Sequence, residues 1–147
     1  MALCRVQPVV VGFCGTFHGN GFVKQIAGDF ETRVNSSFSF QFRTFFKNAL
    51  LLYVEGSSNN FIYSLSLNYG AVLFRYNNTV LRSDRSAYDD GKWHNVKVSR
   101  TLKNASLLVT SLNNDGINDD YVTHSGVMPT YLPNAHYVYF GGNKESR

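Results

Sequence analysis

The feature that most constrains this chain is a strict alternation of apolar and polar side chains between residues 37 and 43. Phe38, Phe40 and Phe42 fall on one face of an extended chain, and polar side chains fill the positions between them. Because successive side chains of a β-strand point to opposite faces, the pattern predicts a half-buried strand. Such a strand needs a second layer to cover its phenylalanines.

Further short apolar runs follow, separated by polar stretches with turn-forming residues. They lie at residues 48–54, 61–67, 71–76, 93–100, 105–110, 121–123 and 137–140. No segment shows a convincing helical period, and 12 Phe and 9 Tyr favour pleated surfaces. Seven or eight short strands without intervening helices predict an all-β fold, an antiparallel β-sandwich of the concanavalin-like jelly-roll kind.

Two turns are specific enough to predict in detail. Asn68–Gly70 separates two apolar runs and predicts a hairpin, and Asp90-Gly91 predicts a turn with a positive φ. After the second turn, Trp93 is expected to plug the end of the sandwich, and Val96 and Val98 to point inward. Packing is the preferred role for Trp93 and the adjacent histidine over any catalytic one.

The length of 147 residues fits one domain. No run approaches the roughly 18 apolar residues that would span a bilayer, so membrane insertion by this segment is not expected. The stretch from Met1 to Thr16 is mildly apolar, but Arg5, Gln7 and Pro8 interrupt it and make it a poor signal-peptide core. If the domain is secreted, its signal is expected elsewhere.

The positive charge is concentrated in the middle of the chain. The net charge is +4, and the segment from residue 75 to 103 carries the whole excess. Candidate contacts for an anionic glycan are the basic residues Arg75, Arg82, Arg85, Lys97, Arg100 and Lys103. The simpler interpretation is a solvated sheet face with interspersed cations, and both remain open. A nucleic-acid partner is not expected, because no exposed-aromatic reader motif accompanies these residues.

Two features bear on the compartment. Cys4 and Cys14 are separated by a short loop that is compatible with a disulfide, although free or intermolecular thiols are alternatives. Three N-x-[ST] sequons, at Asn35, Asn77 and Asn104, lie in polar stretches between apolar runs. That is where glycosylation would place them in a secreted protein.

Several motifs together resemble those of laminin G-like domains. They are Phe-Ser-Phe-Gln-Phe-Arg-Thr from Phe38, Leu-Leu-Leu-Tyr from Leu50, the hairpin of residues 61–76, and Asp-Gly-Lys-Trp-His-Asn-Val-Lys-Val-Ser-Arg from Asp90. Gly-Asn-Gly-Phe-Val from Gly19 is similar to the family's first strand, and Tyr-Phe-Gly-Gly from Tyr139 to a late one. The likeness covers residues 19–142. It predicts a laminin G-like domain over residues 19–147, preceded by an extension or linker at residues 1–18.

The resemblance implies a non-catalytic extracellular module that binds cell-surface receptors or anionic matrix glycans. It also implies calcium at the sandwich rim, with Asn60 and Asn77 as the candidate ligands. Asn60 stands where many members have an aspartate, and an amide oxygen brings no charge, so calcium affinity should fall. Members usually continue to a Gly-Cys element that this chain lacks, so a closing strand is expected to be missing at the C-terminal side.

Two other functions compete with binding. The domain could act only as a structural spacer between neighbouring domains of an extracellular protein. A lectin-like glycosidase would need two carboxylates facing each other across a groove, but none of the glutamates, at positions 31, 55 and 145, alternates along one strand. A Ser-His-Asp site built on one of the four histidines has no nucleophile-elbow motif behind it. The sequence therefore predicts a protein that is not an enzyme.

Overall fold

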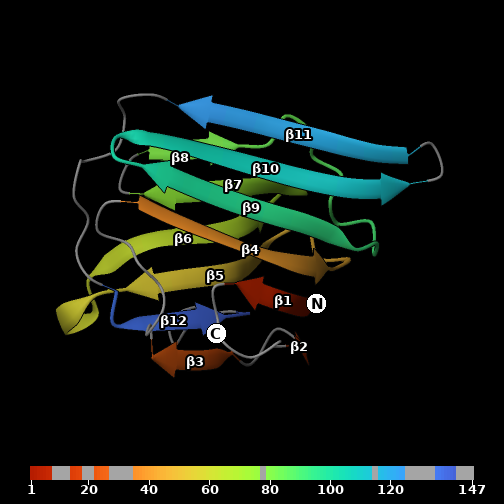
Figure 1. Cartoon of the computed structure of the whole chain (residues 1–147). Helices are drawn as coiled ribbons and strands as arrows, with labels where there is room; N and C mark the ends of the chain where they lie inside the picture. Colours follow the sequence, from red (N-terminus) through yellow and green to blue (C-terminus); the bar gives the residue numbers. More distant parts are fainter. Residues whose placement is uncertain are drawn as a thin grey trace.

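The computed structural model describes residues 1–7, 14–17, 22–26, 35–76, 79–113, 116–124 and 135–141. These residues form two antiparallel sheets of six strands each, stacked one over the other (Figure 1). A single short 3-10 turn, η1 (Ser57–Asn59), interrupts the described strands. The predicted antiparallel β-sandwich of the jelly-roll kind is therefore confirmed.

The first sheet has the strand order β11-β10-β9-β4-β1-β2. Its strands are β1 (Ala2–Gln7), β2 (Cys14–Thr16), β4 (Asn35–Arg43), β9 (His94–Thr101), β10 (Asn104–Asn113) and β11 (Gly116–His124). The second sheet has the order β3-β12-β5-β6-β7-β8. Its strands are β3 (Val23–Ile26), β5 (Ala49–Glu55), β6 (Phe61–Asn68), β7 (Ala71–Tyr76), β8 (Thr79–Arg82) and β12 (Tyr137–Phe140).

The core lies between the sheets, where the period-two pattern places it. The side chains expected to point inward are all at most 3% exposed: Phe38, Phe40, Phe42, Leu65, Leu67, Val96 and Val98. The ring of Phe38 in β4 stacks on that of Tyr63 in β6 at a centroid distance of 5.5 Å, so the two sheets interdigitate. Each fully buried phenylalanine contributes about 2–3 kcal/mol of transfer free energy.

The two predicted turns are confirmed. Tyr69 and Gly70 form the two-residue loop between β6 and β7 with φ values of 49° and 83°. A Cβ on Gly70 would lie 2.3 Å from the carbonyl oxygen of Ser86, so glycine is needed there for space as well as for conformation. Gly91 has φ of 75°, as the turn before β9 requires.

The N-terminal segment differs from the expectation of an extension at residues 1–18. Strand β1 pairs with β4 and with β2, and Leu3 is fully buried in the core. The physical reason is that β4 has β9 on one side only, and a further strand satisfies the backbone groups of its other side. The parts of this segment that the structure describes thus belong to the sandwich.

The second sheet joins distant parts of the chain at its edge. Strand β3 pairs with β12 in a register that sets Val23 opposite Phe140 and Ile26 opposite Tyr137. Strand β12 pairs in turn with β5. Among the described residues there is no helix long and apolar enough to cross a membrane.

Candidate binding surfaces

Three arginines lie on or directly after the two strands at one edge of the second sheet. Arg75 on β7 and Arg82 on the neighbouring β8 are exposed, and Arg85 follows in the loop after β8. We call these three residues the arginine strip. The Arg82 Nη1 lies 3.5 Å from the Asn68 Oδ1, and the Arg75 guanidinium lies 5.4 Å from the centre of the Phe61 ring. Phe61 and Asn68 are the first and last residues of β6, so the guanidiniums of Arg75 and Arg82 are spread along this edge of the sheet.

Asp120 on β11 holds the loop that carries Arg85. Its carboxylate accepts hydrogen bonds from the backbone N–H groups of Asp84 at 3.0 Å and Arg85 at 2.9 Å, and from the Tyr88 hydroxyl at 2.7 Å. Asp120 is 5% exposed. Because β11 is an edge of the first sheet and β8 an edge of the second, this carboxylate ties the two sheets together at the flank.

The hydrogen bonds set the charge state of this contact. Burial alone would raise the pKa of Asp120, but the N–H of Arg85, the Tyr88 hydroxyl and the N–H of Asp84 outweigh it and lower the pKa below its usual value. Burial raises the pKa of Tyr88, and the hydrogen bond to the Asp120 carboxylate raises it further. The pair is therefore held as a carboxylate and a neutral phenol.

A small pocket of about 180 Å³ opens beside this loop. Arg85 and Lys92 contribute cations to its lining and Asp90 contributes a carboxylate, while His94, Ser111 and Asn118 contribute further polar groups. The pocket therefore has a mixed lining of cations, a carboxylate and neutral polar groups. Sequence reasoning did not find it, because it depends on the register of β9, β10 and β11.

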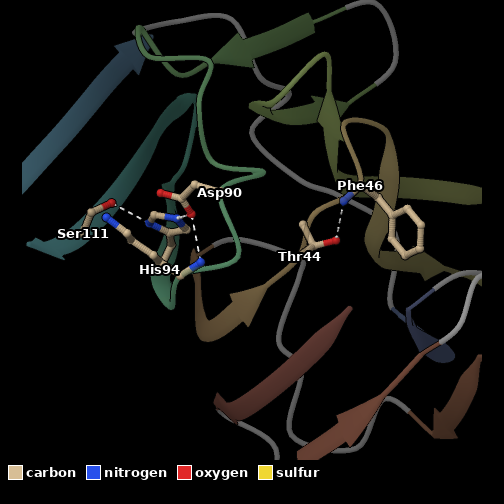
Figure 2. A network of polar contacts seen from close by, with 6 residues as sticks. Thr44, Phe46, Asp90, His94 and Ser111 are labelled. Carbon is tan, nitrogen blue, oxygen red and sulfur yellow. Dashed lines mark hydrogen bonds and ion pairs between the residues drawn. The ribbon is translucent and has the colours of Figure 1, made fainter.

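His94 forms a polar network with the turn before β9 (Figure 2). Its Nε2 lies 2.7 Å from the Asp90 Oδ1 and its Nδ1 lies 2.6 Å from the Ser111 Oγ, and the ring is 4% exposed. Asp90 also accepts the Lys92 N–H at 3.0 Å. Partial burial acts to raise the pKa of Asp90, but the hydrogen bonds from Lys92 and His94 outweigh it and lower the pKa.

The side chains of His94, Asp90 and Ser111 hold strands and turns together at this end of the sandwich. Ser111 on β10 is the cross-strand partner of His94 on β9, so the imidazole links the sheet to the turn at Asp90. The Gly91 N–H donates to the Thr44 carbonyl at 2.9 Å. The Thr44 hydroxyl accepts the Phe46 N–H at 3.0 Å (Figure 2). Both ring nitrogens of His94 are used in holding the loops at this end of the sandwich.

The predicted position of Trp93 was wrong. Its side chain is 40% exposed, and the Arg43 guanidinium lies 5.1 Å from the centre of its ring. The period of two explains the error, because counting back from Val96 and Val98 places His94 inside and Trp93 outside. His94, and not Trp93, fills the end of the sandwich.

The other basic candidates do not join the arginine strip. Lys97 is exposed on β9 of the first sheet, and Lys103 lies in the turn between β9 and β10. Arg100 is a correction, because it is 2% exposed and its Nη1 donates to the Leu102 carbonyl at 2.8 Å. It occupies an inward position of β9, so a glycan has no access to it.

The expected calcium rim is described only in part. Asn60 is exposed between η1 and β6, where its carbonyl accepts the Gly56 N–H at 2.7 Å and its own N–H donates to the Ser57 carbonyl at 3.2 Å. Asn77 lies outside the described residues. In the described ranges no group of three or more His, Cys, Asp or Glu side chains is placed to hold a metal ion. Asn60 alone offers one neutral oxygen, which is a poor fit for calcium.

The cysteines and sequons fall on strands or strand ends. The antiparallel register sets Cys4 of β1 opposite Cys14 of β2. Asn35 begins β4, and Asn104 begins β10 with its side chain exposed. The third sequon residue, Asn77, is the one outside the described residues.

Comparison with known proteins identifies the family. The laminin G domain profile matches residues 42–147. Pikachurin from Bos taurus is 29% identical over 141 residues, which cover 88% of this chain and 13% of pikachurin. The LG1-3 region of the laminin alpha2 chain superposes with a TM-score of 0.75 at 25% identity, over 90% of this chain and 28% of that one.

A second solved structure supports the fold. Domains LG4-5 of the mouse laminin alpha1 chain give a TM-score of 0.65 at 21% identity, over 99% of this chain and 35% of that one. This chain therefore spans only a small part of the length of the proteins it matches. The laminin G domain profile covers more than half of the chain. The chain belongs to the laminin G domain family.

Proposed function

We propose that this domain is a non-catalytic extracellular binding module that recognises anionic glycans, or cell-surface receptors that carry such groups. The arginine strip is the observation that supports this proposal most directly. Arg75, Arg82 and Arg85 lie on one flank, and the Asp120 carboxylate fixes the backbone of Arg85. Holding the backbone of Arg85 in place lowers the entropic cost of ordering this loop when a charged chain binds.

The chemistry of the strip suits sulfate and carboxylate groups. A guanidinium offers parallel N–H donors to two oxygens of such a group, and it stays charged at all physiological pH values. Because the three side chains are exposed, their attraction for an anion is screened by salt over a Debye length of about 10 Å at 0.1 M. Binding through the strip should therefore weaken steeply as salt is added.

Heparin-affinity chromatography tests the strip with a charge-matched control. One variant changes Arg75, Arg82 and Arg85 to Ser. The control changes the exposed Lys47, Lys97 and Lys103 to Ser, which removes the same charge from scattered sites. We expect the first variant to elute at clearly lower salt and the control to elute near the wild type. Equal shifts would show that net charge alone governs retention, and would remove the strip from the proposal.

A structural spacer is the alternative. Arg75 and Arg82 also contact Phe61 and Asn68 of their own sheet, as cations on a merely solvated face would do. A spacer predicts no retention on heparin above very low salt and no signal on an array of sulfated and unsulfated glycans. Retention that the three strip substitutions abolish would favour the binding module.

Calcium is a weaker proposal that rests on Asn60 and Asn77. Calcium binding is tested by comparing thermal unfolding in calcium and in a chelator. The variant Asn60→Asp should bind calcium more tightly, since an added carboxylate raises the charge of the ligand set. We expect at most a small stabilisation of the wild type and a larger one of the variant. No difference in either protein would remove calcium from this domain.

A disulfide between Cys4 and Cys14 is also proposed for the oxidising compartment outside the cell. Directly opposed residues of antiparallel strands have Cα atoms about 4.5–5.5 Å apart, within the range that a disulfide spans. Non-reducing peptide mapping of secreted protein should recover the two cysteines in one linked fragment. Two alkylated thiols in that sample would contradict the bridge.

A further inference from the structure

A shallow groove runs over the outer face of the first sheet, away from the core. Its volume is about 360 Å³. The polar and aromatic side chains that line it come from β9, β10 and β11: Ser99, Thr101, Asn104, Ser106, Tyr121 and Thr123. Hydroxyl and amide groups dominate this lining, so the groove suits a ligand that both donates and accepts many hydrogen bonds.

The groove contains one of the three sequons. Asn104 and Ser106 are two residues apart on β10, so both side chains point to the outer face, while Ala105 between them is 3% exposed and points into the core. Asn104 is exposed at the start of the strand, directly after the turn at Leu102 and Lys103. A sugar attached to the Asn104 side chain would therefore begin inside the groove.

The far part of the groove offers an aromatic surface. Tyr121 on β11 is 61% exposed, and its cross-strand partner on β10 is Leu108, four residues beyond Asn104. Four residues of strand correspond to about 13 Å. That separation is more than one sugar ring covers, so the second sugar of an attached chain is the one that would reach the tyrosine. Thr123 lies opposite Ser106, between the two ends.

We propose that Asn104 carries an N-linked glycan whose first two sugars lie along this groove and cover the Tyr121 ring. The proposal rests on the extracellular setting of the proposed function, because the modification occurs in the secretory pathway. The first N-acetylglucosamine meets the hydroxyls of Ser106 and Thr123. The apolar C–H face of the second packs on the aromatic ring.

The attachment is a transfer from a lipid-linked oligosaccharide pyrophosphate. A bond forms between the Asn104 Nδ2 and the anomeric carbon of the first sugar, and the bond from that carbon to the pyrophosphate oxygen breaks. The amide loses one proton, and the lipid pyrophosphate leaves with the bonding electron pair. The glycan then covers the outer face of the first sheet and leaves the arginine strip, on the other sheet, open to a partner.

The test uses the full chain secreted from glycosylation-competent cells. Glycopeptide mass spectrometry should find a glycan at Asn104 in the wild type and in Ser106→Thr, which keeps the sequon, and none at that site in Asn104→Gln or Ser106→Ala. If no sequon is modified, the extracellular setting itself fails. If Asn35 or Asn77 is modified and Asn104 is bare, only the present inference is overturned.

A second measurement tests whether the glycan lies in the groove. Trimming it with an endoglycosidase that leaves one sugar should lower the Tm of the wild type by about 3 °C, the scale of one lost contact in a domain of this size. The same trimming should shift the Tm of Tyr121→Ser by less than about 1 °C. It should also proceed several-fold faster on that variant. Tyr69→Ser, which removes a tyrosine that is 72% exposed in the β6–β7 turn, should behave as the wild type does.

Two results would overturn the placement of the glycan. One is equal trimming rates and equal Tm shifts in the wild type and in Tyr121→Ser. The other is free N,N′-diacetylchitobiose, even at high concentration, leaving the chemical shifts of Tyr121 and Thr123 unchanged in unglycosylated Asn104→Gln. That second result would mean that the groove has no affinity for the two sugars that the proposal places in it.

Discussion

The two outer faces of the sandwich differ in chemistry although their inner faces are alike. The outer face of the first sheet carries hydroxyl groups, and the Ser37 Oγ lies 3.5 Å from the Ser99 Oγ on it. The outer face of the second sheet carries aromatic rings with cations beside them. The Lys24 Nζ lies 3.9 Å from the centre of the Tyr137 ring, and Arg75 lies beside Phe61.

The difference separates what the fold needs from what it leaves free. Both sheets bury mainly apolar side chains of the same kind at their inner positions, with His94 and Arg100 of β9 as polar exceptions. The outer positions are under no such requirement, so their chemistry is available for recognition or modification. The second face also holds a buried polar pair, in which the Tyr139 hydroxyl donates to the Glu55 Oε1 at 2.9 Å.

The largest expected effect concerns the core that the two faces share. Phe40→Ala in the first sheet and Leu65→Ala in the second should each lower the free energy of unfolding by about 2–5 kcal/mol, through lost burial and a residual cavity. Because the sheets interdigitate, urea unfolding should stay a single transition by circular dichroism and by Trp93 fluorescence. Two separated transitions would show that the sheets unfold independently.

The second-largest loss of unfolding free energy is expected for Asp120, whose carboxylate links the two sheets. Asp120→Asn should cost about 2 kcal/mol at pH 7, because three donors lose a charged acceptor. The folded pKa of Asp120 is depressed, so its stabilisation is present above the unfolded value of about 3.9 and is lost as pH falls through the folded value. Urea titrations should show the gap between variant and wild type closing in acid.

Asp119→Asn is the neighbouring control for this tie. Asp119 is exposed, and its carboxylate accepts one hydrogen bond, from the Thr110 hydroxyl at 3.0 Å. Its substitution should change the free energy of unfolding by less than about 0.5 kcal/mol at any of these pH values. A control that loses as much as Asp120→Asn would mean that the flank is not held at one carboxylate.

Loss of the hydrogen bond between Tyr139 and Glu55 should lower the free energy of unfolding by a smaller amount. Tyr139→Phe removes the hydrogen bond to Glu55 and should cost about 1 kcal/mol. Burial, with the Glu55 hydrogen bond, raises the pKa of Tyr139 to about 12. Its contribution is therefore complete below about pH 10, the unfolded value, and is lost as pH rises towards the folded one.

The alkaline titration sharpens this prediction. Unfolding free energies of wild type and Tyr139→Phe should converge as the pH rises through this window, while Tyr137→Phe, at a half-exposed position, should follow the wild type throughout. A constant gap from neutral to strongly alkaline pH would contradict the assigned role of the Tyr139 hydroxyl.

The smallest stability effects belong to the exposed cations. Arg75→Ser on the second face and Lys97→Ser on the first should each change the free energy of unfolding by less than about 0.5 kcal/mol. Heparin retention should nevertheless fall for Arg75→Ser and stay near the wild-type value for Lys97→Ser. Equal heparin retention of Arg75→Ser and Lys97→Ser would show that the two outer faces do not differ in glycan binding.

The sequence was sufficient for the fold because alternation encodes burial directly. Phe38, Phe40 and Phe42 follow the period of two, and their predicted burial is confirmed. The same rule, applied consistently, would have placed Arg100 inside, since it continues the series from Val96 and Val98. That prediction failed because a cation was assumed to be exposed.

The site was harder to predict because its parts meet only through strand register. Asp120 reaches a loop 35 residues earlier in the chain, and nothing local to either segment indicates the contact. The groove at Asn104 likewise requires β11 to run beside β10 in one particular register. Charge clustering in the sequence therefore grouped Lys103 with Arg82 and Arg85, although Lys103 is in a turn of the other sheet.

The pairing of β3 with β12 has a consequence for biosynthesis. Val23 of β3 lies opposite Phe140 of β12. Strand β3 is therefore synthesised more than a hundred residues before the strand with which it pairs. At about 5–20 residues per second, a ribosome leaves β3 unpaired for several seconds. Closure of this sheet edge therefore has to follow the synthesis of β12, and until then the backbone groups of β3 that pair with it lack their partners.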